Sequence, residues 1–460
     1  MISSHWGLSS EVDRLEAVLV HTPGQELNEV HPWNMEEMLF DGIIYLDKAI
    51  KEHEGFVKRL KGAGARCYQV RDLLSDVLDR ADVEERREVL EEILGHEEAK
   101  RLEKRGIRLE DIGPDDLIVG KKDIEDKPIE DIIRDVRERG RALFLLRPLP
   151  NLYFTRDPAV MSPLGVIICR MRKEARRREA RIMKAIFEHH ELFQGLNTFE
   201  ISGGSEEGFL EGGDFFVLDE ETILIGTGER SDEKGFRQVE EKIISGGDVK
   251  KVIRVSFPKK RTMMHLDTTF TMIDRNKFLV FPFLHGYPEP GPRLFIKILD
   301  HIEREAEVEE GSLTACNIKL NIYSWKIALY EYIEHVRNKK TIAVFDVEKG
   351  AVVRYPTLLE ALKELGFIED VEDDVVYVAG APEVREDHIA LAYHALREQW
   401  DDAANVLAIR PGEVISYDRN ELTIRALEDF SIRVLEIEGD ELIRGRGGPR
   451  CMSMPLSRRR

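Results

Sequence analysis

Cysteine is scarce in this sequence, and long apolar runs are missing. The four cysteines lie far apart and none forms a C-x-x-C pair, which argues against a zinc site or a disulfide framework: Cys67, Cys169, Cys316 and Cys451. No stretch approaches the roughly 20 consecutive apolar residues that a membrane-spanning helix needs. The first residues also lack an apolar targeting segment. We therefore expect a cytoplasmic chain that does not enter a membrane.

Basic residues are outnumbered by acidic ones, and nucleotide-binding motifs are missing. The 460 residues include 68 Lys and Arg against 88 Asp and Glu, a net charge of -20. Nucleic acids and anionic membranes need a basic surface, so neither is expected as a partner. The chain contains no G-x-x-x-x-G-K-[ST] sequence and no G-x-G-x-x-G between a strand and a helix. A nucleotide cofactor is therefore not expected.

The hydrophobic pattern is typical of an α/β protein. Residues 14–22 and 64–74 have strand patterns, and residues 33–62 have a helical one. Later, helical stretches alternate with short apolar or β-branched runs that predict strands: ALFLL, VIIC, FFVL, TILIG, FLVFPF, TIAVF, VVYVAG and NVLAI. This alternation predicts an α/β fold.

Residues 75–141 differ from the rest of the chain. Charged residues dominate this segment, and its apolar residues fall at helical spacing. We predict a small helical domain over 75–141, inserted into a main domain formed by residues 1–74 and 142–460. An alternative interpretation is a set of solvated surface helices without a function of their own.

Two polar clusters lie beside predicted strands, where active sites of α/β proteins often occur. NLYFTRDP supplies Asn151, Phe154 and Asp157, and LEGGDFFVL supplies Glu211 and Asp214 around two glycines. Glycine permits a close approach of the backbone to other groups. The alternative is that Asp157 caps a turn before a proline and that the other acids are solvated turn residues.

Two further clusters contain the reactive side chains. In MHLDTTFTMID, His265 and Asp267 are two residues apart, so an extended strand would direct both to one face. In RGRGGPRCMSMPL, glycines and a proline place Cys451 in a loop with Arg446 and Arg450, and cationic neighbours lower a thiol pKa. A core histidine and an inert buried cysteine are the alternatives.

A cysteine, a histidine and several acids without a metal motif favour one kind of electrophile. Acyl transfer requires hydrogen-bond donors for an oxyanion, and carboxylates would repel that charge. The same carboxylates suit a guanidinium group, which is a planar cation with only N–H donors. The residues therefore predict a guanidino substrate.

The four clusters, in this order and at these separations, resemble arginine deiminase. The resemblance covers nearly the whole chain, including EVDRLEAVLVHTPGQEL, LFDGIIYLDKAIKEHE and REQWDDAANVLAIRPGEVISYDRN. It implies a pseudo-fivefold α/β propeller with an inserted helical domain and no metal or organic cofactor. It also implies an enzyme that hydrolyses L-arginine to L-citrulline and ammonia. The chain is expected to act alone or as a homo-oligomer.

The resemblance implies a role for each catalytic candidate. Cys451 resembles the nucleophile that forms a covalent amidino intermediate, and His265 resembles the general acid and base. Asp157 and Asp267 resemble the pair that binds the guanidinium nitrogens. Glu211 resembles the acid that orients His265 and also contacts the guanidinium.

Six more residues are implied to surround the substrate: Asn151, Phe154, Arg176, Asp214, Arg230 and Arg446. Arg230 resembles the partner of the substrate carboxylate, with Arg176 as a second candidate among three adjacent arginines. Arg446 resembles a gate residue that also affects the thiol, and Asp214 supports the others.

The sequence departs from the family pattern at a few places, and other activities are conceivable. Asp401-Asp402-Ala403 stands where the family often has Asn-Asp-Gly, and Arg450 stands where some relatives carry His. These differences bear on substrate preference and pH optimum. The alternatives are hydrolysis of agmatine or methylarginine, amidino transfer to an amine, and non-catalytic arginine binding. An arginine for the substrate carboxylate speaks against agmatine.

Overall fold

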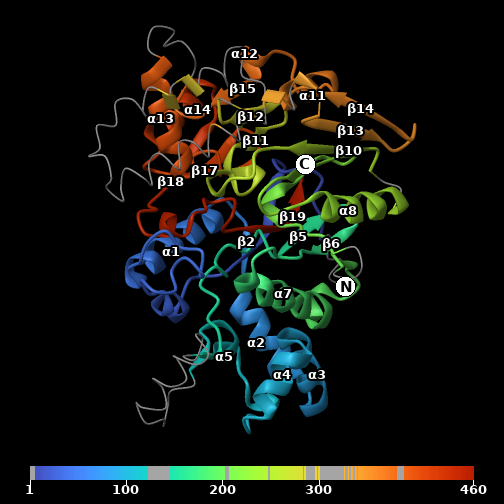
Figure 1. Ribbon diagram of the computed structural model, residues 1–460, viewed down its shortest axis with the longest axis vertical. Helices are drawn as coiled ribbons and strands as arrows, with labels where there is room; N and C mark the ends of the chain where they lie inside the picture. Colours follow the sequence, from blue (N-terminus) through green and yellow to red (C-terminus); the bar gives the residue numbers. More distant parts are fainter. Residues whose placement is uncertain are drawn as a thin grey trace.

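Helices and short β-sheets alternate along the chain of the computed structural model (Figure 1). The structure describes residues 6–122, 144–202, 207–246, 249–282, 284–285, 340–380 and 388–460, with scattered positions between 296 and 338. The predicted α/β class is confirmed. Among these residues, no helix combines the length and the apolar character that crossing a membrane would require.

Among the described residues, one pattern of strand pairing occurs five times. In each unit an antiparallel pair of strands is followed by a third strand that runs parallel to the second of them: β5–β6–β7, β8–β9–β10, β11–β12–β15, β16–β17–β18 and β19–β1–β2. A parallel pair needs a crossover connection, and helices supply it in each unit.

The bounds of the first two units are β5 (Ala159–Ser162), β6 (Gly165–Ile168), α7 (Arg177–His189), β7 (Thr198–Glu200), β8 (Phe215–Asp219), β9 (Thr222–Thr227), α8 (Glu233–Gly246) and β10 (Lys251–Ser256). Those of the next two are β11 (Phe270–Asp274), β12 (Lys277–Val280), α11 (Leu358–Glu364), α12 (Val371–Asp374), β15 (Val375–Tyr377), α13 (His388–Trp400), β16 (Leu407–Arg410), β17 (Glu413–Tyr417), α14 (Glu421–Asp429) and β18 (Arg433–Ile437).

The fifth unit joins the two ends of the described chain. Its elements are β1 (Arg14–Val20), α1 (Leu46–Gly62), β2 (Arg66–Gln69) and β19 (Met454–Arg459). β19 pairs antiparallel with β1, with Leu19 opposite Met454. The loop before β19 holds Cys451, so this pairing ties the cysteine to the N-terminal strand.

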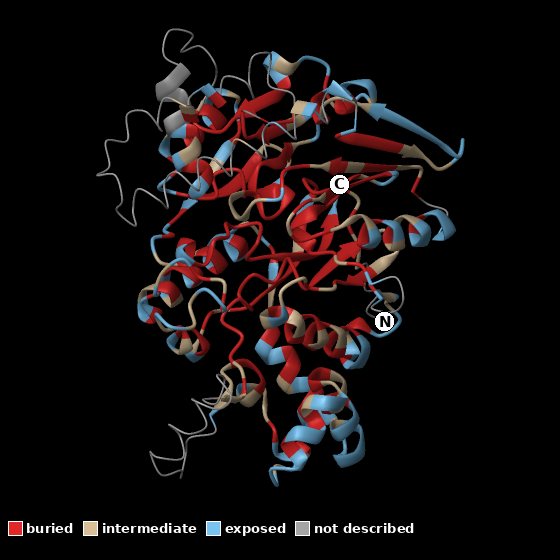
Figure 2. Ribbon diagram, viewed as in Figure 1, coloured by how far each residue is buried: buried red, intermediate tan, exposed pale blue. Residues whose placement is uncertain are grey.

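One unit carries an additional hairpin. β13 (Ile342–Asp346) pairs antiparallel with β10, and β14 (Ala351–Tyr355) pairs with β13, which makes a five-stranded sheet. β14 is the edge strand of this sheet and is largely exposed, at the upper right of Figure 2. A two-residue strand, β3 (Lys121–Lys122), pairs with β4 (Phe144–Leu146) elsewhere.

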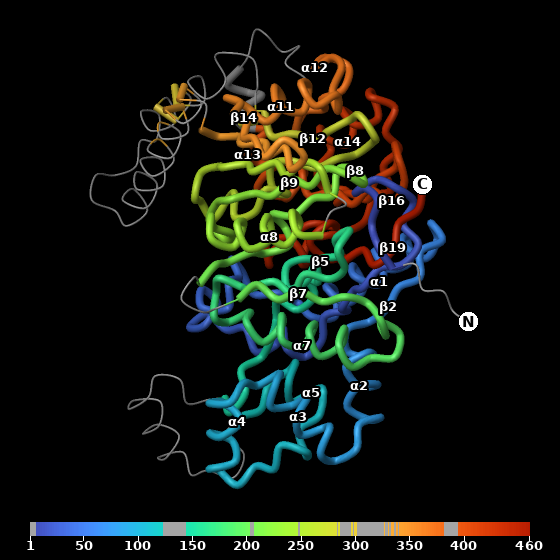
Figure 3. Tube along the Cα trace, turned by 90° about the vertical axis from the view of Figure 1, so that its right-hand side faces the viewer, coloured from blue at the N-terminus to red at the C-terminus, as the bar shows by residue number. Residues whose placement is uncertain are grey.

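Four helices form the end of the molecule that lies lowest in Figures 1 and 3: α2 (Val70–Arg80), α3 (Val83–Leu94), α4 (His96–Glu103) and α5 (Pro114–Ile118). Asp82 caps α3, because its side chain accepts the amides of Glu84 and Glu85. Residues 123–141 of the predicted insertion lie outside the described residues. α2 and α3 pack against α7 of the main body.

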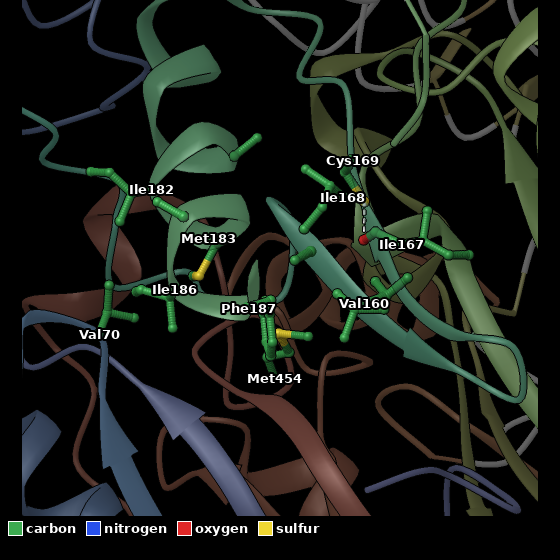
Figure 4. Packing of buried hydrophobic residues seen from close by; sticks show 14 of the residues in the cluster. Val70, Val160, Ile167, Ile168, Cys169, Ile182, Met183, Ile186, Phe187 and Met454 are labelled. Carbon is green, nitrogen blue, oxygen red and sulfur yellow. Dashed lines mark hydrogen bonds between the residues drawn. The ribbon is translucent and has the colours of Figure 1, made fainter. Parts of the chain in front are cut away.

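The buried apolar residues run from these helices into the sheets without a break. One cluster contains Val70, Met183, Ile186 and Phe187 together with Met454 of β19 (Figure 4). Figure 2 shows that the strands are buried along most of their length, whereas the outer faces of α3 and α4 are exposed. The buried strands therefore anchor the loops that precede β5, β8, β11 and β19, which hold Asp157, Glu211, Asp267 and Cys451.

Two predicted elements differ from the structure. The helix predicted over 33–62 begins only at Leu46, because Leu39 has φ 68, a conformation that ends a helix, and Gly42 follows. The strand predicted over 64–74 ends at Gln69. From Val70 the apolar residues have helical spacing, and α2 buries them against α7.

Candidate active site

His265 and Glu211 form a buried pair at the centre of the candidate site. Nε2 of His265 lies 2.8 Å from Oε2 of Glu211, and Nδ1 lies 3.7 Å from Oδ1 of Asp157. Burial would lower the pKa of His265, but Asp157, Glu211 and Asp214 raise it to about 9. The imidazole is therefore protonated at neutral pH and can donate a proton.

Two glycines allow the Glu211 loop to pass close to the histidine. Gly212 and Gly213 lie in a short 3-10 helix directly after Glu211. A Cβ at Gly213 would stand 2.7 Å from Cγ of His265, and one at Gly212 would stand 2.0 Å from a backbone carbonyl oxygen. The E-G-G-D sequence is thus required by close approach, as the sequence suggested.

His265 and Asp267 do not lie in a strand, contrary to the prediction. His265 precedes a 3-10 turn that contains Asp267, and β11 begins only at Phe270. The hydroxyl of Thr268 donates to the carbonyl oxygen of His265 at 2.7 Å and stabilises this turn. The turn directs the two side chains to different partners, whereas a strand would have placed them side by side.

Cys451 is buried in the loop before β19 and contacts Asp267. Its Sγ lies 3.7 Å from Oδ2 of Asp267. Burial raises the pKa of the Cys451 thiol well above its usual value, and Asp267 and Asp157 raise it further. The expectation of a lowered thiol pKa was therefore wrong. Arg450 does lower it, but less than burial and the carboxylates raise it.

Asp267 lies between the nucleophile and Arg450. Nη1 of Arg450 donates to Oδ2 of Asp267 at 2.9 Å, and the same guanidinium lies 3.8 Å from the ring centroid of Phe216 and 3.3 Å from Oε1 of Glu11. The other carboxylate oxygen, Oδ1 of Asp267, is buried and has no hydrogen-bond partner among the described residues. An orphan buried acceptor next to a thiol is a place for a donor group of a ligand.

Asp157 is held by Arg176 on the other side of the histidine. Nη1 of Arg176 donates to Oδ2 of Asp157 at 2.6 Å, and Nε donates to Oε2 of Glu179 at 3.0 Å. Nη2 donates to the carbonyl oxygens of Asn151 and Phe154 at 3.3 and 3.2 Å. Most donors of Arg176 are thus already used inside the protein.

Arg230 retains more of its donors. Nη1 lies 3.2 Å from Oε2 of Glu211, Nη2 contacts the sulfur of Met264 at 3.7 Å, and Nε has no partner among the described residues. Of the two arginines predicted for a substrate carboxylate, Arg230 is therefore the better placed to bind one.

Asp214 holds the backbone of the turn that contains Leu266. Its Oδ1 accepts the amide of Leu266 at 2.8 Å, and its Oδ2 accepts the hydroxyl of Ser231 at 2.5 Å. Burial raises the pKa of Asp214 to about 7. Asp214 thereby holds the turn between His265 and Asp267.

Comparison with known proteins assigns the family. A family model described as arginine deiminase matches residues 36–290 and 384–458. Arginine deiminase of Listeria monocytogenes serotype 4a is 34% identical over 462 residues, which are 98% of this chain and 97% of the relative. The chain belongs to the arginine deiminase family. Arginine deiminase of Bacillus cereus is 32% identical over 468 residues, with 98% of both chains covered.

The family fold has a counterpart among solved structures. SxtG, an amidinotransferase from Microseira wollei in the saxitoxin biosynthetic pathway, superimposes with a TM-score of 0.50. The sequences are 13% identical, and the match covers 99% of this chain and 98% of SxtG. This likeness concerns the α/β fold alone.

Three further residues were implied by the family resemblance, namely Asn151, Phe154 and Arg446, and each is buried. The side-chain amide of Asn151 donates to the carbonyl oxygen of Met38 at 2.7 Å, and Phe154 is buried. Arg446 lies in a left-handed conformation with its guanidinium 3.8 Å from the ring centroid of Trp400. Arg446 is itself buried, and its Nη1 donates to the carbonyl oxygen of Trp400 at 2.6 Å.

Three of the site residues lie close enough together to contact one metal ion. Asp157, Glu211 and His265 bring potential ligand atoms within 4.8 Å of one another. Each carboxylate already faces an arginine, Arg176 and Arg230 respectively, so the attraction for a further cation is reduced. That the enzyme needs no metal or organic cofactor remains a prediction.

Asn405 was missed by the sequence interpretation, which saw only a strand in N-V-L-A-I. It is fully buried, and its Oδ1 accepts the amide of Cys451 at 2.9 Å. Asp402 was noted only as a departure from the family pattern. It is buried as well, and burial raises its pKa to about 7. An Asn before a strand gives no signal of its own, because caps and turns use the same residue.

Proposed function

We propose that the chain hydrolyses L-arginine to L-citrulline and ammonia, with Cys451 as the nucleophile. The observation that carries this proposal is the orphan Oδ1 of Asp267, whose other oxygen lies 3.7 Å from Sγ of Cys451. A guanidinium nitrogen that donates to Oδ1 would bring its carbon beside the sulfur. Asp157 would bind nitrogens of the same group from the side of His265.

The thiol proton of Cys451 passes to the solvent as the substrate binds, and Sγ then forms a bond with the guanidinium carbon. One C–N bond then breaks, and the departing nitrogen leaves as ammonia with a proton from His265. A protonated His265 suits this role, and Glu211 keeps its ring oriented. The product is a positively charged amidino group on the sulfur that still carries the rest of arginine.

The second step consumes water. His265 accepts a proton from water as its oxygen adds to the amidino carbon. The S–C bond breaks, the remaining hydroxyl proton passes to the sulfur, and citrulline leaves with the thiol restored. Taken together, one water enters, one ammonia and one citrulline leave, and the protons balance as ammonium.

The raised thiol pKa is consistent with activation by the substrate. In the free enzyme, burial together with Asp267 and Asp157 opposes a thiolate at Cys451. A bound guanidinium cation would offset their charge and favour ionisation of Cys451 next to it. The thiolate would thus form only when the guanidinium that it attacks is bound. The free enzyme would hold an unreactive thiol.

Arg230 is proposed to bind the substrate carboxylate, since it keeps unused donors. Arg176 is proposed to hold Asp157, with any contact to substrate as a secondary role. Asn151 and Phe154, whose backbone carbonyl oxygens accept from Arg176, are proposed to line the substrate pocket. Arg446 is proposed as a gate residue for the substrate site that also affects the thiol of Cys451.

The five repeated strand units support a pseudo-fivefold α/β propeller as the finer description of the fold. Residues 75–141 are proposed to be a helical domain inserted into the unit of 1–74 and 142–460. Its α2 starts before this boundary, and its core continues into the main body. A cytoplasmic location and a homo-oligomer are part of the same proposal.

The test is the release of citrulline and ammonia from L-arginine, with agmatine and methylarginine in parallel and Cys451→Ala as control. Equal release of both products from arginine, lost in Cys451→Ala, supports the proposal. Turnover of agmatine without arginine would contradict the role of Arg230. Formation of an amidinated amine instead of citrulline would indicate amidino transfer.

Arg230→Ala separates the substrates further. A charge-assisted hydrogen bond contributes roughly 1.5–3 kcal/mol, so the variant should lose about 10- to 100-fold in kcat/KM for arginine relative to agmatine. The ratio cancels effects through Glu211, which both substrates share. An unchanged ratio would assign the carboxylate to another residue.

A further inference from the structure

The nucleophile and its neighbouring carboxylate both lie in irregular backbone. Cys451 is in a turn between a 3-10 helix over Leu442–Gly445 and β19, and Asp267 is in the turn before β11. Neither residue belongs to a strand ladder that would fix its position. Their 3.7 Å separation must therefore be maintained by other contacts.

Asn405 makes those contacts with one side chain. Its Oδ1 accepts the amide of Cys451 at 2.9 Å, and its Nδ2 donates to the carbonyl oxygen of Asp267 at 3.3 Å. Its own carbonyl oxygen accepts the amide of Arg450 at 3.2 Å. One fully buried residue thus connects the loop of the nucleophile with the turn of the carboxylate.

The backbone of Asn405 is itself fixed. Its amide donates to the carbonyl oxygen of Asp402 at 2.9 Å, and Asp402 has φ 54. The hydroxyl of Thr271 in β11 donates to the carbonyl oxygen of Ala404 at 2.6 Å. The amide group is therefore held by a turn tied to a buried strand, rather than by a flexible loop.

The cysteine loop is shaped to fit against this residue. A Cβ at Gly448 would stand 2.7 Å from the carbonyl oxygen and 3.0 Å from Oδ1 of Asn405. Only glycine lets the loop come this close. The contact between Gly448 and Asn405 thus accompanies the hydrogen bonds that fix Cys451.

We propose that Asn405 is a positioning residue for the reaction, which holds Cys451 and Asp267 at the separation at which sulfur and guanidinium carbon meet. This inference rests on the proposed function. The physical reason is the steep dependence of the attack on distance, for which an error of 1 Å can cost about 100-fold in rate. Asn405 itself contacts neither sulfur nor substrate in this role.

Two substitutions separate the two hydrogen bonds of the side chain. Asn405→Ala removes both. Asn405→Asp keeps an acceptor for the amide of Cys451 but loses the donor to Asp267. The control is Thr423→Val, because Thr423 is also fully buried and its hydroxyl also connects distant segments, accepting the amide of Ala379 at 2.8 Å.

Kinetics give the first outcome. Asn405→Ala should lower kcat about 100-fold with KM for arginine within about threefold, because Arg450 still holds the carboxylate of Asp267 for binding while the attack geometry of Cys451 is lost. Asn405→Asp should also lose activity. Thr423→Val should keep the wild-type kcat even if its melting temperature falls as much as that of Asn405→Ala. Normal kcat in either Asn405 variant would overturn the proposal.

Hydrogen–deuterium exchange of the free enzymes gives a second outcome that needs no turnover. The peptide containing Cys451 should exchange faster in Asn405→Ala than in wild type, and near the wild-type rate in Asn405→Asp and Thr423→Val. Unchanged exchange of this peptide in Asn405→Ala would overturn the proposal. If the wild type releases no citrulline, the proposed function fails, and exchange still tests the connection between the two loops.

Discussion

Gly213 lies directly against the ring of His265, and a Cβ there would stand 2.8 Å from Nδ1. Gly213→Ala should therefore displace the imidazole from Glu211. General acid–base catalysis contributes about 10²–10⁴-fold, so kcat should fall within that range. Steady-state kinetics on arginine will measure it. Gly55→Ala is the matched control, since Gly55 lies in α1 with no heavy atom near the added methyl, and it should leave kcat unchanged. Equal kcat values in the two variants would contradict the assignment of His265.

The pH dependence of kcat/KM should show how Glu211 affects the pKa of His265. Burial lowers the pKa of His265, whereas Asp157, Glu211 and Asp214 raise it to about 9. The proton donor is the charged form, so activity should decline as pH rises through about 9. Glu211→Gln removes one of the charges that raise this pKa.

In Glu211→Gln the basic limb of kcat/KM should therefore move to lower pH by about one unit or more. Asp219→Asn, a change in a half-buried carboxylate at the end of β8, provides the control and should leave the limb in place. A basic limb that stays at the same pH in Glu211→Gln would mean that another group supplies the proton.

Arg450 should be essential for folding as well as for the site. It neutralises Asp267 and Glu11, and all three side chains are buried. Arg450→Gln leaves the buried carboxylate of Asp267 without its partner and leaves Glu11 with Arg156 at 3.8 Å, which costs about 3–5 kcal/mol in the free energy of unfolding. Urea denaturation will measure the loss.

Arg237→Gln is the control for Arg450→Gln, because Arg237 forms an exposed pair with Glu233 on α8. Exposed pairs contribute little, so its midpoint of denaturation should not change. Similar midpoints for the two variants would show that the buried ion pairs do not stabilise the protein.

The sequence predicted the parts of the site that depend on residue type and loop position. Gly212 and Gly213 signalled a close approach, and the structure places His265 there. The polar clusters around Asp157, Glu211, His265 and Cys451 do meet, and each lies in the loop before the first strand of a unit. These predictions needed only local patterns and a known family order.

What the sequence did not predict depends on long-range contacts. The pKa of Cys451 is raised rather than lowered, because burial and Asp267 outweigh Arg450. Asn405 connects to residues 138 and 46 positions away in the chain. The turn at His265 replaced a predicted strand because a threonine hydroxyl closes it. None of these relationships has a local sequence pattern.

The most direct test of the account is mass spectrometry of the enzyme quenched in acid during turnover of arginine. We predict that the peptide containing Cys451 carries arginine less ammonia, and that this adduct appears before citrulline and decays as citrulline accumulates. The adduct should be missing in Cys451→Ala. Citrulline formed at full rate without any adduct on Cys451, or with an adduct on another cysteine, would contradict the account.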